Sequence, residues 1–307
     1  CGGGGGSSSA LSPAPPSAVA TTAPTVPSPS GSVPMTISIP RGTPSAAARA
    51  ARFFSPSTGS LAIYDGPTLI YVANLALDST PPFTTIYAKP GSSTTVAFGS
   101  CTFTNSTATC TLTLTSTIGP HKFDIVAYAS VQRPQADTST PPAFTSVISS
   151  EGELSVTLSP GANAGQTLTM LGVASKVIIA GPANGPYNQA TQFGYRIQDS
   201  TSAQIVAPGS AYDNGPVTIT AAPAGIVTIS PNSIATPPAS QGDQNFNVTC
   251  VNASGGAVTI SFNARTTPNT AYASALTYTT SNYSGAVIAT QPFSCDSSTA
   301  TIPITVQ

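Results

Sequence analysis

The feature that most constrains the fold of this chain is a strict alternation of apolar and hydroxyl-bearing residues. From position 108 to 115 the even positions hold Ala, Cys, Leu and Leu, and every odd position is Thr. A spacing of two places the apolar side chains on one face of a strand and the threonines on the other. Because threonine is β-branched, it suits the exposed face of a pleated sheet. The pattern predicts a β-strand with one buried face.

The same alternation recurs along most of the chain and predicts an all-β fold. It is clearest at 35–39, 154–158, 217–220, 227–229, 246–250, 258–262 and 302–306, and glycine- and proline-rich clusters separate these segments. Because one hydrophobic core rarely keeps growing beyond about 250–300 residues, a chain of 307 residues predicts two. We expect two tandem β-sandwich domains, at 34–172 and 173–307, preceded by a tether over residues 1–33.

The charge content is very low. Nine Lys and Arg residues stand against ten Asp and Glu residues, and charged residues make up 6% of the chain. Such a chain has no field that could attract phosphates, so nucleic acid is not an expected partner. No apolar run approaches the roughly 18 residues that a membrane-spanning helix needs. The one segment with a helical composition is 45–54, which Pro56 would end.

The five cysteines divide into Cys1 and two internal pairs. If Cys101 faces Cys110, a two-residue turn at 105–106 closes a hairpin, and the two cysteines occupy a non-hydrogen-bonded position where a disulfide fits. Residues 96 and 98 share an even parity whereas residues 101 and 103 share an odd one. This pairing therefore requires a β-bulge near Gly99.

The second pair is predicted from side-chain parity. Cys250 shares its face with Phe246 and Val248, and Cys295 shares its face with Phe293, so both thiols point inward. A Cys250–Cys295 disulfide would join two sheets or two neighbouring strands, and the closed loop would contribute about 4 kcal/mol. Structural disulfides persist in oxidising compartments, which indicates an exported protein.

The first residues resemble the start of a mature bacterial lipoprotein. Cys1 is followed by five glycines and three serines, and the stretch up to residue 32 is rich in Ser, Pro, Ala and Thr without an apolar period. The composition of this stretch is typical of a disordered or polyproline-like spacer. The resemblance implies that Cys1 carries lipid, which makes the membrane a partner. Because Gly2 replaces the Asp that retains such proteins at the inner membrane, the resemblance implies an extracytoplasmic location at the outer membrane or cell surface.

Segments of both predicted domains resemble modules of bacterial surface proteins. Residues 195–199, 205–206, 217–220 and 229–231 are similar to immunoglobulin-like domains of the invasin and intimin type. Residues 52–58 and 123–128 look like the amino-terminal module of surface lipoproteins that carry such domains. The resemblance implies two tandem immunoglobulin-like sandwiches that are displayed at a surface, with no reaction of their own.

Few residues offer catalytic or metal-binding chemistry. His121 is the only histidine, and Glu151 and Glu153 are the only glutamates, which spacing places on one face of a strand. Asp199, Asp213, Asp243 and Asp296 stand in loop-like contexts, where carboxylates could hold a cation, but they lack the dense spacing of a dedicated calcium loop. We predict no catalytic residue, no metal site and no cofactor.

Three tyrosines in one segment are candidate ligand contacts. Tyr272, Tyr278 and Tyr283 stand among Thr and Asn residues, a mixture that could stack on sugar rings or contact a protein, although alternation along a sheet explains it equally well. The leading hypothesis is a structural or adhesive surface lipoprotein. The alternatives are a binding module for a polysaccharide or a protein, a self-associating filament subunit, and an enzyme.

Overall fold

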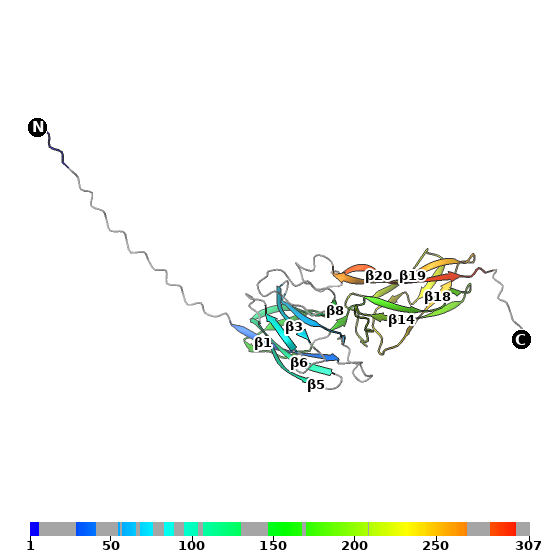
Figure 1. Cartoon of the computed structure of the whole chain (residues 1–307), viewed down its shortest axis with the longest axis horizontal. Helices are drawn as coiled ribbons and strands as arrows, with labels where there is room; N and C mark the ends of the chain where they lie inside the picture. The colour runs from blue at the N-terminus through cyan, green and yellow to red at the C-terminus, as the bar shows by residue number, and fades with distance from the viewer. Residues whose placement is uncertain are drawn as a thin grey trace.

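The computed structural model describes residues 1–5, 29–40, 55, 57–65, 68–75, 83–88, 95–103, 107–129, 147–167, 170–207, 209–268 and 283–298. All regular structure in these residues is β-strand, so the predicted all-β class is confirmed. The strands form four sheets, which pair into two β-sandwiches that lie end to end (Figure 1). Within the described ranges, no helix is long and apolar enough to cross a membrane. The segment predicted to be helical, 45–54, lies outside these ranges.

The N-terminal sandwich consists of two sheets. The first runs in the order β10-β1-β6-β5, with β9 also paired to β1, and the second in the order β11-β8-β7-β2-β3-β4. Their strands are β1 (Ser30–Pro40), β2 (Ser60–Asp65), β3 (Thr68–Leu75), β4 (Phe83–Ala88), β5 (Thr95–Phe103), β6 (Thr107–Thr117), β7 (Gly119–Tyr128), β8 (Val147–Leu158), β9 (Gly161–Ala162), β10 (Gln166–Thr167) and β11 (Leu171–Gly172).

The core of this sandwich follows the alternation of its strands. Leu112 and Leu114 of β6 are fully buried, whereas the threonines between and beside them are partly exposed. They pack in one cluster with Met35 of β1 and, from the second sheet, Ile63 of β2 and Phe123 of β7. The hydroxyl-bearing face of β6 therefore points outward, as the period of two predicts.

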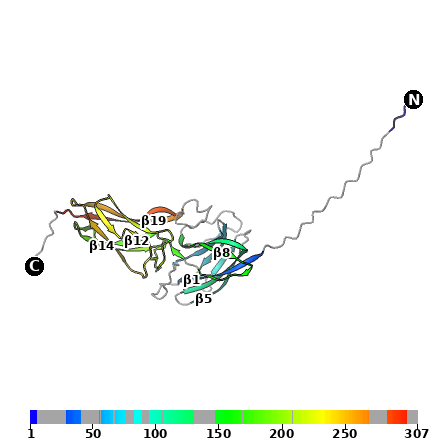
Figure 2. The ribbon, with the colours of Figure 1, turned by 180° about the vertical axis from the view of Figure 1, so that it is seen from behind.

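The C-terminal sandwich also has two sheets, with strand orders β12-β14-β18-β16 and β13-β20-β19-β15-β17. Their strands are β12 (Lys176–Ala180), β13 (Asn184–Gly185), β14 (Ala190–Gln198), β15 (Val217–Ala222), β16 (Val227–Ser230), β17 (Ser233–Ile234), β18 (Gln244–Cys250), β19 (Gly256–Pro268) and β20 (Tyr283–Cys295). The strand β20 runs from the junction between the sandwiches to the far end of the molecule, seen in red in Figure 1 and from behind in Figure 2.

Aromatic rings fill the centre of the C-terminal core. Phe246 of β18 lies 5.2 Å from Phe193 of β14 and 5.4 Å from Phe262 of β19, measured between ring centroids, and Phe193 lies 5.4 Å from Phe293 of β20. Since β19 and β20 belong to the opposite sheet from β14 and β18, these contacts hold the two sheets together.

The strand β1 begins at Ser30, inside the segment predicted as the tether and before the predicted domain start at residue 34. Ser30 pairs with Thr117 and Ser32 pairs with Thr115, while Val33 is fully buried. A Cβ at Gly31 would lie 2.3 Å from the carbonyl oxygen of Ser159, so this position needs glycine. Glycine and serine are typical of linkers, and here the close approach of another backbone segment places them in a strand.

Candidate functional site

The segment that joins the two sandwiches is fixed on its N-terminal side. Leu171 and Gly172 form β11, which pairs with Ser150 and Ser149 of β8. The backbone N–H of Val173 then donates a 3.0 Å hydrogen bond to the carbonyl oxygen of Ile148. The connection therefore extends the second sheet of the N-terminal sandwich up to residue 173.

The C-terminal sandwich holds the same segment from the other side. The backbone N–H of Asp213 donates to Gly172 O over 3.0 Å. The Asn214 side chain accepts from Ala174 N at 3.0 Å, donates to Ala174 O at 2.8 Å, and also donates to Arg265 O. Since Asn214 is 1% exposed, these bonds are shielded from water. The Asn214 side chain therefore makes the pair of hydrogen bonds to the Ala174 backbone that a neighbouring strand would otherwise make.

A second contact joins the sandwiches through hydroxyl groups. Ser55, which is fully buried, lies with its Oγ 3.3 Å from Thr201 Oγ1. Thr201 belongs to a tight loop in which Asp199 Oδ1 accepts from Thr201 N, Thr201 Oγ1 and Ala203 N at 2.7–3.0 Å. The fully buried Asp199 thus orders the loop that reaches the N-terminal sandwich.

The environment of Tyr212, next to this junction, leads us to expect that the folded protein loses stability at alkaline pH. Its hydroxyl is buried and has no hydrogen-bond partner among the described residues, and burial, followed by the neighbouring Tyr195, raises its pKa well above the usual value. Burial also raises the pKa of Tyr64 and Tyr195. An unfolded tyrosine ionises near pH 10, whereas these buried hydroxyls resist ionisation to a higher pH. The folded state therefore keeps its full stability below about pH 10 and loses stability as the pH rises toward the folded-state pKa.

We therefore expect urea unfolding midpoints that fall steeply above about pH 10. In Tyr212→Phe this fall should be shallower, and stability at pH 7 should be unchanged or higher, because the variant removes a buried hydroxyl without a partner. Cys1→Ser serves as the parent in all samples, so that its thiol cannot exchange with disulfides at high pH. Identical pH profiles for Tyr212→Phe and the parent would contradict the expectation.

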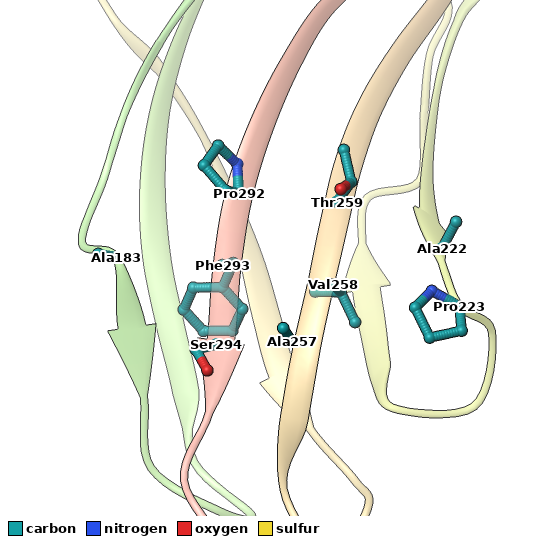
Figure 3. Close-up of a pocket in the computed structure, with 9 residues that line it drawn as sticks. All are labelled: Ala183, Ala222, Pro223, Ala257, Val258, Thr259, Pro292, Phe293 and Ser294. Carbon is teal, nitrogen blue, oxygen red and sulfur yellow. The ribbon is translucent and has the colours of Figure 1, made fainter.

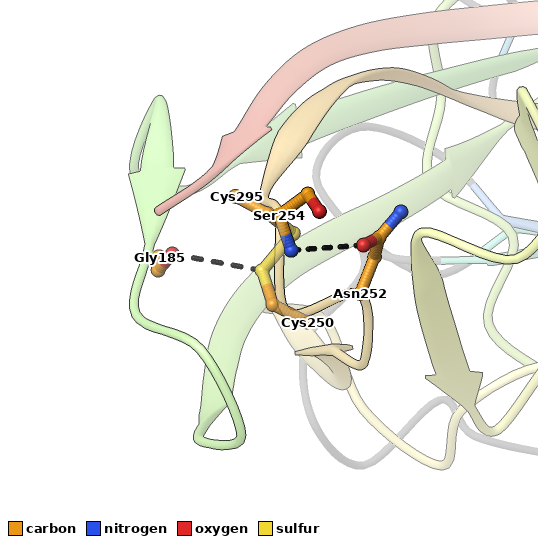
Figure 4. Close-up of a disulfide and its surroundings, with 5 residues drawn as sticks. All are labelled: Gly185, Cys250, Asn252, Ser254 and Cys295. Carbon is orange, nitrogen blue, oxygen red and sulfur yellow. Dashed lines mark hydrogen bonds between the residues drawn. A yellow bond between two sulfur atoms is a disulfide. The ribbon is translucent and has the colours of Figure 1, made fainter. Parts of the chain in front are cut away.

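The predicted disulfide between Cys250 and Cys295 is present. The two Cα atoms lie 5.6 Å apart, and the bridge joins β18 of one sheet to β20 of the other at the far end of the sandwich (Figure 4). Cys250 Sγ also lies 3.5 Å from the carbonyl oxygen of Gly185. The bridge therefore crosses the core between the sheets and does not join neighbouring strands.

The backbone register of the first pair also matches the prediction. Cys101 lies opposite Cys110 and Phe103 lies opposite Ala108, and the register shifts between Phe98 and Cys101, which is the bulge required near Gly99. The side chains of both cysteines lie outside the described part of the chain, so a Cys101–Cys110 bond stays a prediction. Cys1 is an exposed free thiol, and its lipid modification also stays a prediction.

The other candidate residues do not converge on a described site. Tyr272, Tyr278 and the side chain of Tyr283 lie outside the described residues, as do the side chains of Glu151 and Glu153, so the ligand-contact prediction stays open. Asp243 is paired with the Arg196 guanidinium. Within the described ranges, no three His, Cys, Asp or Glu residues come together in a group that could hold a metal ion.

His121 has a structural position that the sequence does not reveal. Its Nδ1 lies 3.0 Å from Asp65 Oδ2, and its Nε2 donates to Thr117 O over 2.8 Å. The ring is stacked on Phe123 at 5.4 Å. These contacts tie the ends of β2, β6 and β7 together, so the histidine connects the two sheets of the N-terminal sandwich. A spacing signal could not have identified it, since its partners are 4 and 56 residues away.

Comparisons with known proteins add little to this description. The sequence matches no protein-family model and no curated protein. Among solved structures, the chain is similar to domains 4 and 5 of the S-layer protein SbsC, with 12% identity, 76% of this chain and 96% of that chain covered, and a TM-score of 0.26. For domains 4–9 of SbsC the identity is 11%, the match covers 80% of this chain and 31% of that chain, and the TM-score is 0.27. At these TM-scores the similarity carries no argument about function.

Proposed function

We propose that this chain is a non-catalytic structural protein of the cell surface, in which the two sandwiches act as a stiff stalk. The observation that carries the proposal is the junction. Each of the five consecutive residues 171–175 is held through its backbone. Leu171 and Gly172 pair with β8, and Val173 N donates to Ile148 O. Ala174 N donates to the Asn214 side chain, and Ser175 N donates to Gln198 O at 2.9 Å. A connection in which the backbone of every residue is held in this way resists bending, whereas domains that are joined by a flexible linker reorient relative to each other by default.

The arrangement of the chain supports a spacer role. The strand β1 enters at one end of the molecule and β20 leaves at the other, so the two sandwich lengths add along one axis (Figures 1 and 2). The disulfide lies at the far end, where it ties β20 to the opposite sheet. A stalk of this kind holds whatever follows Cys295 away from the surface to which the N-terminus is attached.

The proposed attachment is a lipid on Cys1, with the exposed glycines after it as a loose connection. Several acyl chains on one residue anchor firmly, since each buried methylene contributes about 0.8 kcal/mol. Intact-mass measurement of the membrane-extracted protein should show acylation, and Cys1→Ser should release the chain into the soluble fraction. An unmodified Cys1 in membrane-bound protein would remove the anchor from the proposal and leave the stalk untouched.

Asn214→Ala tests the stalk itself. The variant removes the side chain that satisfies Ala174 N, Ala174 O and Arg265 O, and each buried backbone group left without a partner costs about 1–3 kcal/mol. We expect spin-label distances between the sandwiches to change from one narrow distribution to a broad one, and the unfolding free energy to fall by about 3 kcal/mol.

The matched control is Asn263→Ala in the same sandwich. Asn263 donates to Thr220 Oγ1 on the sheet surface and not at the junction, so the distance distribution should stay narrow. A distribution that is already broad in the unsubstituted protein would show a flexible joint and end the stalk proposal.

A further inference from the structure

An apolar groove crosses the outer face of the second sheet of the C-terminal sandwich, near its far end (Figure 3). It has a volume of about 390 Å³, and its floor and walls come from β15 and the residue after it, from β19 and β20, and from the residue before β13. The lining residues are Ala183, Ala222, Pro223, Ala257, Val258, Thr259, Pro292, Phe293 and Ser294.

The groove exists because small outward-facing residues stand side by side on three strands. Thr259 of β19 lies opposite Pro292 of β20 on one side and Ala222 of β15 on the other, and Ala257 lies opposite Ser294. Because alanine and serine fill little space, the surface is hollowed between Pro292 and Pro223, which Figure 3 shows on either side of β19.

The lining points to an apolar, uncharged occupant. None of the nine lining residues is ionisable, and apart from Thr259 and Ser294 their side chains are apolar. The groove is open along the sheet surface, so it would leave much of a small metabolite exposed to water, whereas small-molecule sites normally bury most of their ligand. An extended peptide that presents aliphatic side chains on one side fits such a surface better.

The chain carries a segment with this chemistry a few residues after the lining residue Ser294 in the sequence. Residues 299–307 read Thr-Ala-Thr-Ile-Pro-Ile-Thr-Val-Gln, without a charge and with Ile302, Ile304 and Val306 alternating. An extended segment places these three side chains on one side, over about 13 Å from residue 302 to 306. The three strands under the groove span about 10 Å, because neighbouring strands lie about 4.8 Å apart.

The described residues bring the start of this segment to the end of the groove. Ser298 N donates to Ala253 O over 2.9 Å, and Asp296 N donates to Gly185 O over 3.0 Å. Gly185 lies two residues from the lining residue Ala183, and Cys295 pairs with Gly256, next to Ala257. Nine residues reach up to about 30 Å, so they can turn back and cross the groove.

We propose that the groove is the docking site of residues 299–307 of the same chain, with Ile302, Ile304 and Val306 in contact with its floor. Docking in the same chain is favoured over capture of a second copy by the short connection from Ser298, which keeps the local concentration of the segment high. Pro303 has no backbone N–H, so the segment lies across the sheet through its side chains and does not extend the sheet as an added strand. This inference is independent of the stalk and of the lipid anchor.

Cysteine accessibility tests the proposal. Thr259→Cys places a thiol in the groove, and Thr218→Cys places one on the same outer face of β15 outside it, both in the Cys1→Ser background. In the full chain, maleimide should react with residue 259 about tenfold more slowly than with residue 218, since reaction must wait for the segment to leave. Ending the chain at Ser298, or Ile304→Ser, should make the two rates equal, whereas Thr305→Ser should preserve the difference.

Each other outcome counts against the proposal. Equal rates in the full chain would show an empty groove. Protection that grows with protein concentration would assign the groove to a second copy, and protection that survives the truncation would assign it to another part of the molecule. If a thiol at 259 disturbs folding, the methyl resonances of Ala222 and Ala257 in the unsubstituted protein report the same event, and the proposal fails if truncation leaves them unchanged.

Discussion

Removing the Cys250–Cys295 bridge is expected to lower the unfolding free energy of the C-terminal sandwich by about 4 kcal/mol. The two cysteines are 45 residues apart, so the bridge closes a long loop and restricts the unfolded chain strongly. It also fixes the end of β18 to the end of β20, across the core. Urea unfolding of Cys250→Ala/Cys295→Ala, followed by tyrosine fluorescence, measures the loss.

The predicted Cys101–Cys110 pair provides the comparison. The loop between these residues is short, so Cys101→Ala/Cys110→Ala should cost less, about 2.7 kcal/mol, and only in the N-terminal sandwich. A reducing agent should reproduce the effect of each double substitution and have no further effect once all four cysteines are replaced. If the 250/295 variant unfolds at the same urea concentration as its parent, the bridge does not stabilise the sandwich by restricting the unfolded chain. The expectation from the length of the closed loop would then be wrong.

The predictions that succeeded rest on local geometry. The period of two places Leu112 and Leu114 inward without any knowledge of what they contact, because a strand has only two faces. The shift of register before Cys101 was also predictable, since a hairpin turn and a change of parity leave a bulge as the only solution. Such inferences need no information about distant parts of the chain.

The junction could not be predicted, because its bonds join residues that are far apart in the sequence. The composition of segment 213–216 is typical of a turn, but nothing in it shows that the Asn214 side chain binds Ala174, 40 residues away. His121 is a similar case, with Asp65 as its partner. The strand at Ser30 and Gly31 was missed for a different reason. Their residue types are typical of linkers, and only the pairing with the neighbouring strand β6 makes them part of a sheet.

The second large effect is expected from Phe246→Ala, with a loss of about 3–5 kcal/mol. Phe246 is 1% exposed and contacts rings from both sheets, namely Phe193, Tyr195 and Phe262, at centroid distances of 5.2–6.0 Å. Removal of its ring leaves a cavity that strands cannot close easily, because backbone hydrogen bonds on either side of β18 hold them at fixed spacing. Denaturant unfolding measures the loss.

Two further variants distinguish packing from general damage. Ile178→Ala removes an aliphatic side chain that is 49% exposed on β12, and it should change stability by less than about 0.5 kcal/mol. Phe193→Ala combined with Phe246→Ala should cost less than the sum of the two single losses by about 0.5–3 kcal/mol, because the two rings contact each other and the second substitution enlarges an existing cavity. Strict additivity would mean that the rings stabilise the sandwich independently, and the aromatic cluster would then not be the element that holds the two sheets of the stalk together.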